Sequence, residues 1–217
     1  MTAAAGAASA ADIGGVDEHR AGLQRIARGW LARRPLFLDT ETTGTGADDE
    51  IVELAIVDAD GAVLLDQRVK PRKPIPPDAT RVHGISDFDV RGAPGWPAVH
   101  ADVHRLLQGR ALVIYNAAFD LRLLVQTARV HRCPRPPAES AFCAMKLYAA
   151  WHGEWNDQRG GYRWQRLGEA ARQMGLALPE NLHAASADAA LTRALLVAMA
   201  GDQRVSGPPF GSQASAL

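Results

Sequence analysis

The stretch FLDTETTG, from Phe37 to Gly44, places two carboxylates at the end of an apolar run. Residues two apart in a β-strand share a face, so Asp39 and Glu41 converge if the strand reaches that far. Close carboxylates repel each other, and burial makes their ionisation costlier still. The pattern therefore indicates a cation between them, either a metal ion or an arginine, unless the strand end is solvated and holds only water.

A second acidic segment, NAAFD (116–120), follows the apolar run ALVIY (111–115) directly. A short continuous apolar run is typical of a strand that is buried on both faces. Residues just beyond the carboxyl ends of such strands line the natural crevice of the sheet. Asp120 is predicted there, in the first turn of a helix, where an acid can also serve only to stabilise the helix dipole.

The third segment, HAASAD (183–188), puts a histidine on a loop and an acid in the first turn of a helix for which Ser186 is the predicted cap. Taken alone, His183 is a surface histidine and Asp188 another first-turn acid. The three segments together supply four carboxylates, and oxygen ligands of this kind suit hard divalent cations. Two such ions about 3.5–4 Å apart can clamp the attacking and leaving oxygens of a phosphoryl displacement. A neutral His183 beside them can take the proton from the attacking water.

The order of the predicted elements indicates an α/β fold. Strands joined by tight turns come first, and alternating helices and strands follow, which is typical of a mixed sheet with helices on its faces. The predicted strands are LFLDT (36–40), a hairpin over 50–70 around the turn DADG, ALVIYN (111–116) and a short strand within 138–143. The predicted helices are 17–34, 96–109, 117–131, a segment ending near 153, 164–176 and 186–200, with a loop over 158–164.

The composition fits one soluble domain of 217 residues. Lys plus Arg and Asp plus Glu both total 24, which argues against charge-driven, non-specific coating of DNA. The two cysteines, Cys133 and Cys143, form no Cys-x-x-Cys pair, so neither a zinc site of that kind nor a disulfide framework is expected, and a reducing cytosol suits the chain. Neither a signal peptide nor a membrane-spanning stretch is predicted. The expected location is therefore cytoplasmic.

The three segments, in this order and at these separations, resemble the exonuclease motifs of the DEDD superfamily, in its histidine-bearing DEDDh branch. The proofreading (epsilon) subunit of bacterial DNA polymerase III is its best-known member. VHGIS (82–86) and YRWQRLGEAARQMGL (162–176) also resemble segments of that family, and the likeness covers roughly residues 35–200. The resemblance implies a ribonuclease-H-like fold, with a five-stranded mixed sheet flanked by helices. It also implies hydrolysis of the 3′-terminal phosphodiester with release of nucleoside 5′-monophosphates.

The resemblance assigns roles to individual residues. His183 matches the general base, and two divalent cations, Mg²⁺ or Mn²⁺, are the implied cofactors. The residues that match the metal-binding carboxylates are Asp39, Glu41, Asp120 and Asp188. Three more residues match positions near the terminal nucleotide: Thr42, His83 and Phe119. Each of these three residues could instead have only a structural role. The threonine could stabilise a turn, the histidine could pack against its short helix, and the phenylalanine could belong to the core.

Several other residues allow two interpretations of their role. Glu53 is either a semi-buried acid that holds a ligand or water, or a charge at the sheet edge. Trp151 and Trp155 either stack on bases or form one packed helix face. Where many members of the family carry an acid and a threonine, this chain has Cys143 and Ala144, and the thiol is predicted to be packed in the core. Arginines that could line a strand path are Arg122, Arg159, Arg163 and Arg166.

These observations predict a two-metal 3′–5′ exonuclease domain over residues 35–200, preceded by a helix over 17–34 and flanked by disordered tails over 1–16 and 201–217. The predicted partner is a single-stranded nucleic acid 3′ end, with DNA favoured over RNA, in a proofreading or repair-like role. An exoribonuclease of the oligoribonuclease or ribonuclease T kind is the first alternative, since the 2′-OH is read by pocket shape and not by these motifs. A non-catalytic accessory subunit of a replicase is the second, with a DNA polymerase subunit as its partner.

Overall fold

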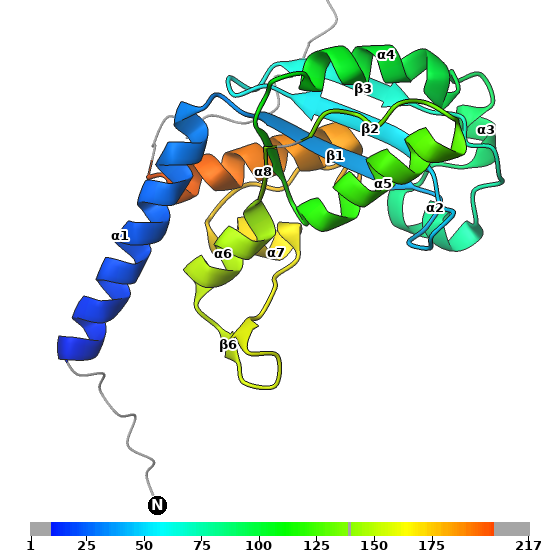
Figure 1. Ribbon diagram of the computed structural model, residues 1–217. Coiled ribbons are helices and arrows are strands. Elements are labelled where there is room, and N and C mark those ends of the chain that lie inside the picture. The colour runs from blue at the N-terminus through cyan, green and yellow to red at the C-terminus, as the bar shows by residue number, and fades with distance from the viewer. Residues whose placement is uncertain (1–9, 139, 202–217) are drawn as a thin grey trace, which may run out of the picture.

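The computed structural model describes residues 10–138 and 140–201, and centres on a five-stranded sheet of order β3-β2-β1-β4-β5 (Figure 1). β1 pairs antiparallel with β2, which pairs antiparallel with β3, whereas β4 lies parallel to β1 and to β5. The strands are β1 (Leu36–Thr42), β2 (Ile51–Val57), β3 (Val63–Arg68), β4 (Leu112–Ile114) and β5 (Ala141–Cys143). The predicted five-stranded mixed sheet is confirmed.

The β2–β3 hairpin forms where the sequence predicts it. All seven residues of β2 are buried, while β3, at the sheet edge, alternates between exposed and half-buried positions. The carboxylate of Asp58 accepts hydrogen bonds from the backbone N–H groups of Asp60 and Ala62, both at 2.9 Å. Gly61 takes a positive φ of 97°, which a residue without Cβ adopts at no steric cost. The turn chemistry of DADG therefore fixes the register of the hairpin.

Helices cover both faces of the sheet. Figure 1 shows α5 crossing in front of the strands, with α8 behind them. Alternation along β1 divides its side chains between two cores, with Leu36 and Leu38 in one and Phe37 in the other. The first core is closed by α4 (Trp96–Leu107) and α5 (Ala117–Val130). The second is closed by α1 (Ala10–Ala32), α6 (Ala144–His152), α7 (Leu167–Gln173) and α8 (Ala185–Met199).

Two short helices occupy the connection that follows β3. They are α2 (Pro77–His83) and α3 (Asp87–Val90). A small third core holds this connection on β2, and its buried members are Val52, Ile75, Ile85 and Val90. Cys143 packs against the first core, which confirms the predicted structural environment of that thiol.

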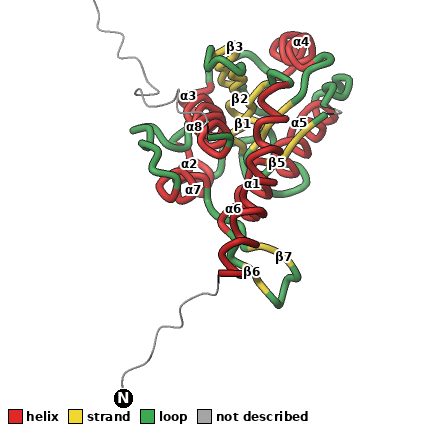
Figure 2. The backbone as a smooth tube through the Cα atoms, turned by 90° about the vertical axis from the view of Figure 1, so that its left-hand side faces the viewer, coloured by secondary structure: helices red, strands yellow, loops and turns green. Residues whose placement is uncertain are grey.

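The N-terminal helix begins earlier than predicted. α1 starts at Ala10 and not at Asp17, so residues 10–16 of the predicted disordered tail are helical (Figure 2). Leu23 and Ala27 are buried against α8 and α6, and the Trp30 ring stacks on Phe142 with centroids 4.7 Å apart. Residues 1–9 and 202–217, predicted as tails, lie outside the described residues. None of the helices described is long and apolar enough to cross a membrane.

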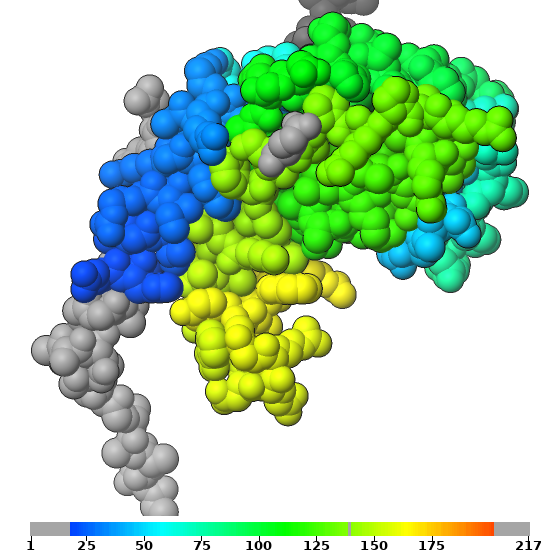
Figure 3. Space-filling model, viewed as in Figure 1, coloured from blue at the N-terminus to red at the C-terminus, as the bar shows by residue number. Residues whose placement is uncertain are grey.

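The predicted loop over 158–164 contains one strand of a short ribbon, so that prediction is wrong in part. β6 (Trp155–Asn156) and β7 (Gly161–Tyr162) pair antiparallel, and the segment projects from the domain below α6 (Figure 3). Gly160, with φ of 59°, makes the turn. Because α6 ends at His152, Trp151 and Trp155 do not form one helix face, but each ring has a packing partner: Trp151 lies against the second core, and Trp155 meets the edge of Tyr162 across the ribbon, with centroids 5.3 Å apart.

Candidate active site

The acidic residues gather where β1 extends beyond β4. The parallel pairing between these strands involves only Leu36 and Phe37 of β1, which then continues to Thr42. A gap at the carboxyl end of neighbouring parallel strands is where open α/β sheets bind their ligands. Asp39 and Glu41 lie on this free part of β1, as the sequence predicts.

Alternation along β1 turns both carboxylates toward α8. Asp39 and Glu41 share the face of Phe37, which packs in the α8 core. Asp188 lies in the first turn of that helix. Glu41 stands opposite Glu53 in the β1–β2 register, so a third strand carboxylate joins the same face.

Asp120 reaches the site from the other side of the sheet. It is buried in the first turn of α5, and its Oδ1 accepts a hydrogen bond of 2.7 Å from the Thr40 hydroxyl. Thr40 lies between Asp39 and Glu41 in sequence, but its side chain points to the α5 face. Thr40 was not identified from the sequence. Its position was informative, because a polar residue there follows Leu36 and Leu38 on the buried face of β1 and needs a hydrogen-bond partner.

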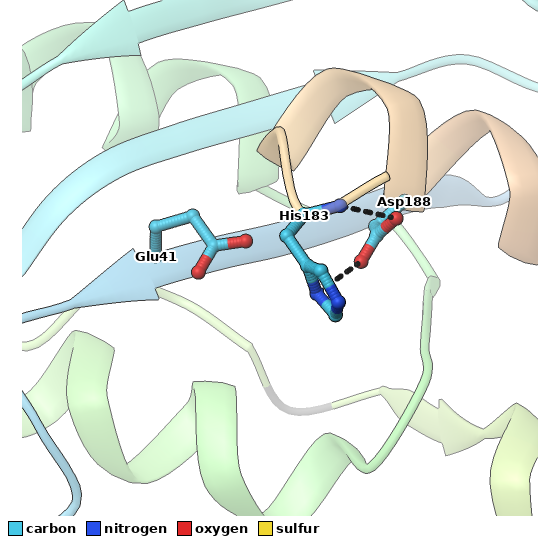
Figure 4. A group of neighbouring side chains, drawn as sticks. All are labelled: Glu41, His183 and Asp188. Carbon is cyan, nitrogen blue, oxygen red and sulfur yellow. Dashed lines mark hydrogen bonds and ion pairs between the residues drawn. The ribbon is translucent and has the colours of Figure 1, made fainter. Parts of the chain in front are cut away.

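His183 turns into the carboxylate cluster. Figure 4 shows Glu41, His183 and Asp188 pointing toward one another, and their nearest ligand atoms all lie within 4.8 Å. The His183 Nδ1 is 3.9 Å from Asp188 Oδ2, and the His183 backbone N–H donates to Asp188 Oδ1 at 3.4 Å. The backbone of His183 has φ of 72°, a left-handed conformation that is uncommon for a residue with a Cβ. The contacts with Asp188 hold the loop in this arrangement.

Glu53 ties the sheet to the start of α8. Its Oε2 accepts a hydrogen bond of 2.9 Å from the backbone N–H of Ala185, a helix-start donor that lacks an intrahelical partner. Its Oε1 lies 3.5 Å from the Arg68 guanidinium, which also lies 3.9 Å from Asp89. Glu53 is buried, so of the two sequence readings the sheet-edge charge is wrong. The side chain fixes the helix that carries Asp188.

The cluster makes ionisation of its own carboxyl groups unfavourable. Burial, followed by the charges of Asp120, Asp188, Glu41 and Glu53, raises the pKa of Asp39 well above its ordinary value. Burial and the neighbouring acids raise the pKa of Glu41 to about 9. Burial also raises the pKa of Asp120 to about 7, although hydrogen bonds from Thr40 act in the opposite direction.

Asp188 has its pKa raised by burial as well, with His183 opposing the shift. Within residues 10–138 and 140–201, neither lysine nor arginine pairs with these four acids, because the ion pairs of those side chains all go to other carboxylates. A set of hard, partly buried oxygen donors without a basic partner fits divalent cations. This excludes an arginine ion pair as the partner of Asp39 and Glu41.

In the presence of a chelator, the free energy of unfolding should fall as the pH rises from about 4 to about 9, the window set by the ordinary and raised pKa values. An acid with a raised pKa keeps its proton longer in the folded chain than in the unfolded chain. The folded state therefore binds more protons, and its stability is lost as the pH passes through the raised values. Urea denaturation at several pH values with EDTA measures this slope.

Replacing the EDTA with Mn²⁺ or Mg²⁺ in otherwise identical samples should remove the slope or reverse it, because the ions bind the deprotonated carboxylates of the folded state only. A stability that is flat over this pH range in EDTA and insensitive to either ion would contradict the cluster as a cation site.

The three residues matched to the terminal nucleotide lie beside the cluster. Thr42 is buried, and its hydroxyl donates to the Gly44 carbonyl at 2.8 Å. His83 Nε2 lies 3.1 Å from the Thr42 carbonyl, while its Nδ1 accepts from the Ile85 N–H at 3.0 Å. Burial lowers the pKa of His83, which favours the neutral ring. These contacts give both residues a structural role, and their contact with substrate stays a prediction.

Phe119 is half-buried and packs against the first core, with the Arg122 guanidinium 5.3 Å from its ring centroid. Arg122 itself donates to the carbonyls of Thr45 and Gly46, so it braces the β1–β2 loop. Asn116 has a left-handed backbone at the start of α5, and its side chain makes no capping hydrogen bond.

A pocket of about 880 Å³ opens next to His183 and Asp188. It lies between the end of α2 and the segment that leads into α7. Its lining includes Val82, Asn116 and Trp164. A concave, largely apolar surface beside a group of acids with perturbed pKa values is the expected form of an enzyme's substrate site.

Comparison with known proteins agrees with this arrangement. Residues 36–196 match the family model RNase_T, described as exonuclease. The exonuclease CP81 of Escherichia phage 186 is 40% identical over 183 residues, which cover 82% of this chain and 94% of the phage protein. The DNA polymerase III subunit epsilon of Pasteurella multocida is 37% identical over 98 residues. The chain spans only 39% of the length of that subunit.

Solved structures show the same architecture. Exonuclease X in complex with 5′ overhanging duplex DNA has a TM-score of 0.55 at 28% identity, over 77% of this chain and 92% of that one. The nuclease domain of 3′hExo, a DEDDh family member bound to rAMP, has a TM-score of 0.63 at 17% identity, with the same coverage. The second likeness supports the fold alone.

The family match covers the whole sheet and the segments that carry all four acids. Together with the near full-length likeness to the phage protein, it shows that this chain belongs to the RNase T family and is a 3′–5′ exonuclease of the DEDD type, related to the epsilon subunit of DNA polymerase III.

Proposed function

We propose that this exonuclease uses two divalent cations, Mg²⁺ or Mn²⁺, to hydrolyse the 3′-terminal phosphodiester of single-stranded DNA and release nucleoside 5′-monophosphates. The observation that carries the proposal is the convergence of four carboxylates from β1, α5 and α8 with His183 at one edge of the sheet. Enzymes of this family typically use divalent metals.

The carboxylates of Asp39, Glu41, Asp120 and Asp188 are the proposed ligands. When bound, two cations would supply positive charge to the scissile phosphate and to the attacking and leaving oxygens. Thr40 holds Asp120 through its hydroxyl, and Glu53 holds the start of α8, so the ligands from opposite faces of the sheet keep their relative positions. A site whose groups are already in position can stabilise the charge that develops in the transition state without having to rearrange.

His183 is the proposed general base. Its imidazole lies at the edge of the carboxylate cluster and is about half exposed, so water reaches it. The ring would take the proton of the attacking water at the nitrogen that faces the phosphate, while Asp188 stabilises the charged imidazolium. Thr42, His83 and Phe119 are proposed to surround the terminal nucleotide, which places the scissile phosphate against the acids.

DNA is the proposed substrate because Exonuclease X, the solved relative at 28% identity, was captured with overhanging duplex DNA. RNA is the alternative, since RNA exonuclease 4 of Cryptococcus neoformans is 33% identical over 95 residues, and the chain covers 23% of that protein. The 3′hExo domain was likewise solved with rAMP. A polymerase subunit as partner rests on the epsilon likeness, which spans under half of this chain.

A time course with a 5′-labelled single-stranded DNA and its RNA twin tests the proposal. We expect a ladder that shortens from the 3′ end of the DNA with Mg²⁺ or Mn²⁺ and is absent in EDTA. A faster ladder on the RNA would reassign the enzyme as an exoribonuclease. No cleavage of either strand by folded protein would overturn the catalytic assignment and favour an accessory subunit, which a pull-down with polymerase subunits would then detect.

A further inference from the structure

Trp164 is a large aromatic side chain held open to solvent beside the catalytic cluster. It is 57% exposed and lines the pocket that also contains His183 and Asp188. Trp96 is fully buried, and Trp30 and Trp151 pack against the second core. An exposed indole in a concave site is a ready surface for a planar ligand.

The backbone on both sides of Trp164 is fixed. The Gln165 carbonyl accepts a hydrogen bond of 2.8 Å from the Tyr115 hydroxyl, and the Arg163 N–H donates to the Glu154 carbonyl at 2.7 Å. Tyr115 directly precedes the helix start that carries Asp120. The backbone at Trp164 is therefore tied to the strand end on which the active site is built, so the indole is presented from a fixed point beside the acids.

The charges around the pocket differ in their pairing. Arg81 pairs with Asp78, and Arg172 pairs with Glu169, so these two guanidinium groups are already neutralised. Arg166 is exposed and, within the described residues, forms no ion pair. The pocket thus offers one aromatic face and one guanidinium available for an anion, which matches the base and the phosphate of a nucleotide.

We propose that Trp164 stacks on the penultimate base of the substrate strand and that Arg166 contacts a phosphate upstream of the scissile bond. The inference rests on the proposed function and extends it to a second nucleotide subsite. The pocket shares His183 and Asp188 with the catalytic cluster, whereas Thr42, His83 and Phe119 do not line it. A strand whose terminal nucleotide meets those three residues therefore reaches Trp164 with its next nucleotide. The apolar side chain of Val82, on the lining at the end of α2, extends the surface available to that base.

The test compares the wild type with Trp164→Ala, each on an intact DNA decamer and on a decamer that lacks the base at its penultimate position. Binding of fluorescein-labelled DNA is followed by anisotropy in EDTA, where no turnover occurs, and kcat/KM is measured separately with Mg²⁺. We expect Trp164→Ala to weaken binding of the intact strand about 5- to 150-fold, the range for one stacked base. On the abasic strand the same variant should cause no further loss. Trp164→Phe should keep most of the affinity.

Trp155→Ala is the matched control, because Trp155 is 55% exposed on the same projecting segment but does not line the pocket. The Trp155→Ala variant should bind the intact and the abasic decamer with the affinity of the wild type. For the phosphate contact, the logarithm of the binding constant is plotted against the logarithm of the salt concentration. Arg166→Gln should make this plot less steep by about 0.7. Arg163→Gln should leave the slope unchanged, because Arg163 is already paired with Glu154.

Equal losses on intact and abasic strands would overturn the stacking role, as would wild-type binding by Trp164→Ala. The anisotropy result stands whether or not the wild type hydrolyses DNA. A wild type that binds the decamer through Trp164 without cleaving it would contradict the proposed function and leave the subsite intact.

Discussion

Asp39→Asn is expected to lower the rate of hydrolysis by about three orders of magnitude, because the metal ions of such sites contribute several kcal/mol to the transition state. The same change should raise the thermal midpoint in EDTA. Burial and the charges of Asp120, Asp188 and Glu41 raise the pKa of Asp39, so its ionised form opposes folding, and a neutral amide removes that repulsion. For a chain of this size each kcal/mol gained corresponds to about 2–4 °C.

The opposite signs of the two effects separate catalysis from folding. Asp66→Asn is a matched control, because Asp66 lies in the same row of the sheet, across Ala55 from Asp39, but is exposed on β3. It should change neither turnover nor stability. If Asp39→Asn retained wild-type turnover, the two-cation assignment would be wrong, and a large loss of stability in EDTA would show that the carboxylate is structural.

The acids could be predicted from the sequence because their placement follows local rules. Strand alternation puts Asp39 and Glu41 on one face, the helix that directly follows β4 places Asp120 beyond a strand end, and Asp188 lies in the first turn of the helix that follows a loop. The hairpin after β2 could be predicted for the same reason, since its turn residues are adjacent in sequence.

The contacts that fix those acids could not be predicted in this way. Thr40 meets Asp120, and Glu53 meets the backbone of Ala185, through hydrogen bonds between segments far apart in the chain. No local pattern specifies which distant donor a buried carboxylate will find. The backbone position of Trp164 likewise depends on the contact between Tyr115 and Gln165, which only the packed fold brings together.

The start of α1 and the β6–β7 ribbon show a different limit. Residues 10–16 read as a weak, glycine-containing segment, yet the helix includes them. Propensity is a weak signal where a helix continues from a well-packed part such as that around Leu23 and Ala27. The ribbon has only two residues in each strand, too few to produce a readable alternation.

His183→Ala is expected to lower kcat by about 10²- to 10⁴-fold, the usual contribution of a positioned general base. The imidazole is 51% exposed and lies on a loop, so the thermal midpoint should stay close to that of the wild type. His104→Ala, on α4 and away from the acids, serves as the control and should leave turnover unchanged. Single-turnover rates at saturating Mg²⁺ measure the effect on the chemical step.

The dependence of the rate on Mg²⁺ concentration decides how His183 acts. The ring lies close enough to Glu41 and Asp188 to share a cation with them, so a ligand role and a base role both fit the static geometry. A base contributes only in the transition state, so its loss lowers the maximal rate and leaves the Mg²⁺ concentration for half-maximal rate unchanged. A ligand contributes to binding of the ion, so its loss raises that concentration and the rate recovers at high Mg²⁺. We expect the first pattern, and recovery of the wild-type rate by excess Mg²⁺ would show that His183 holds the metal instead of moving the proton.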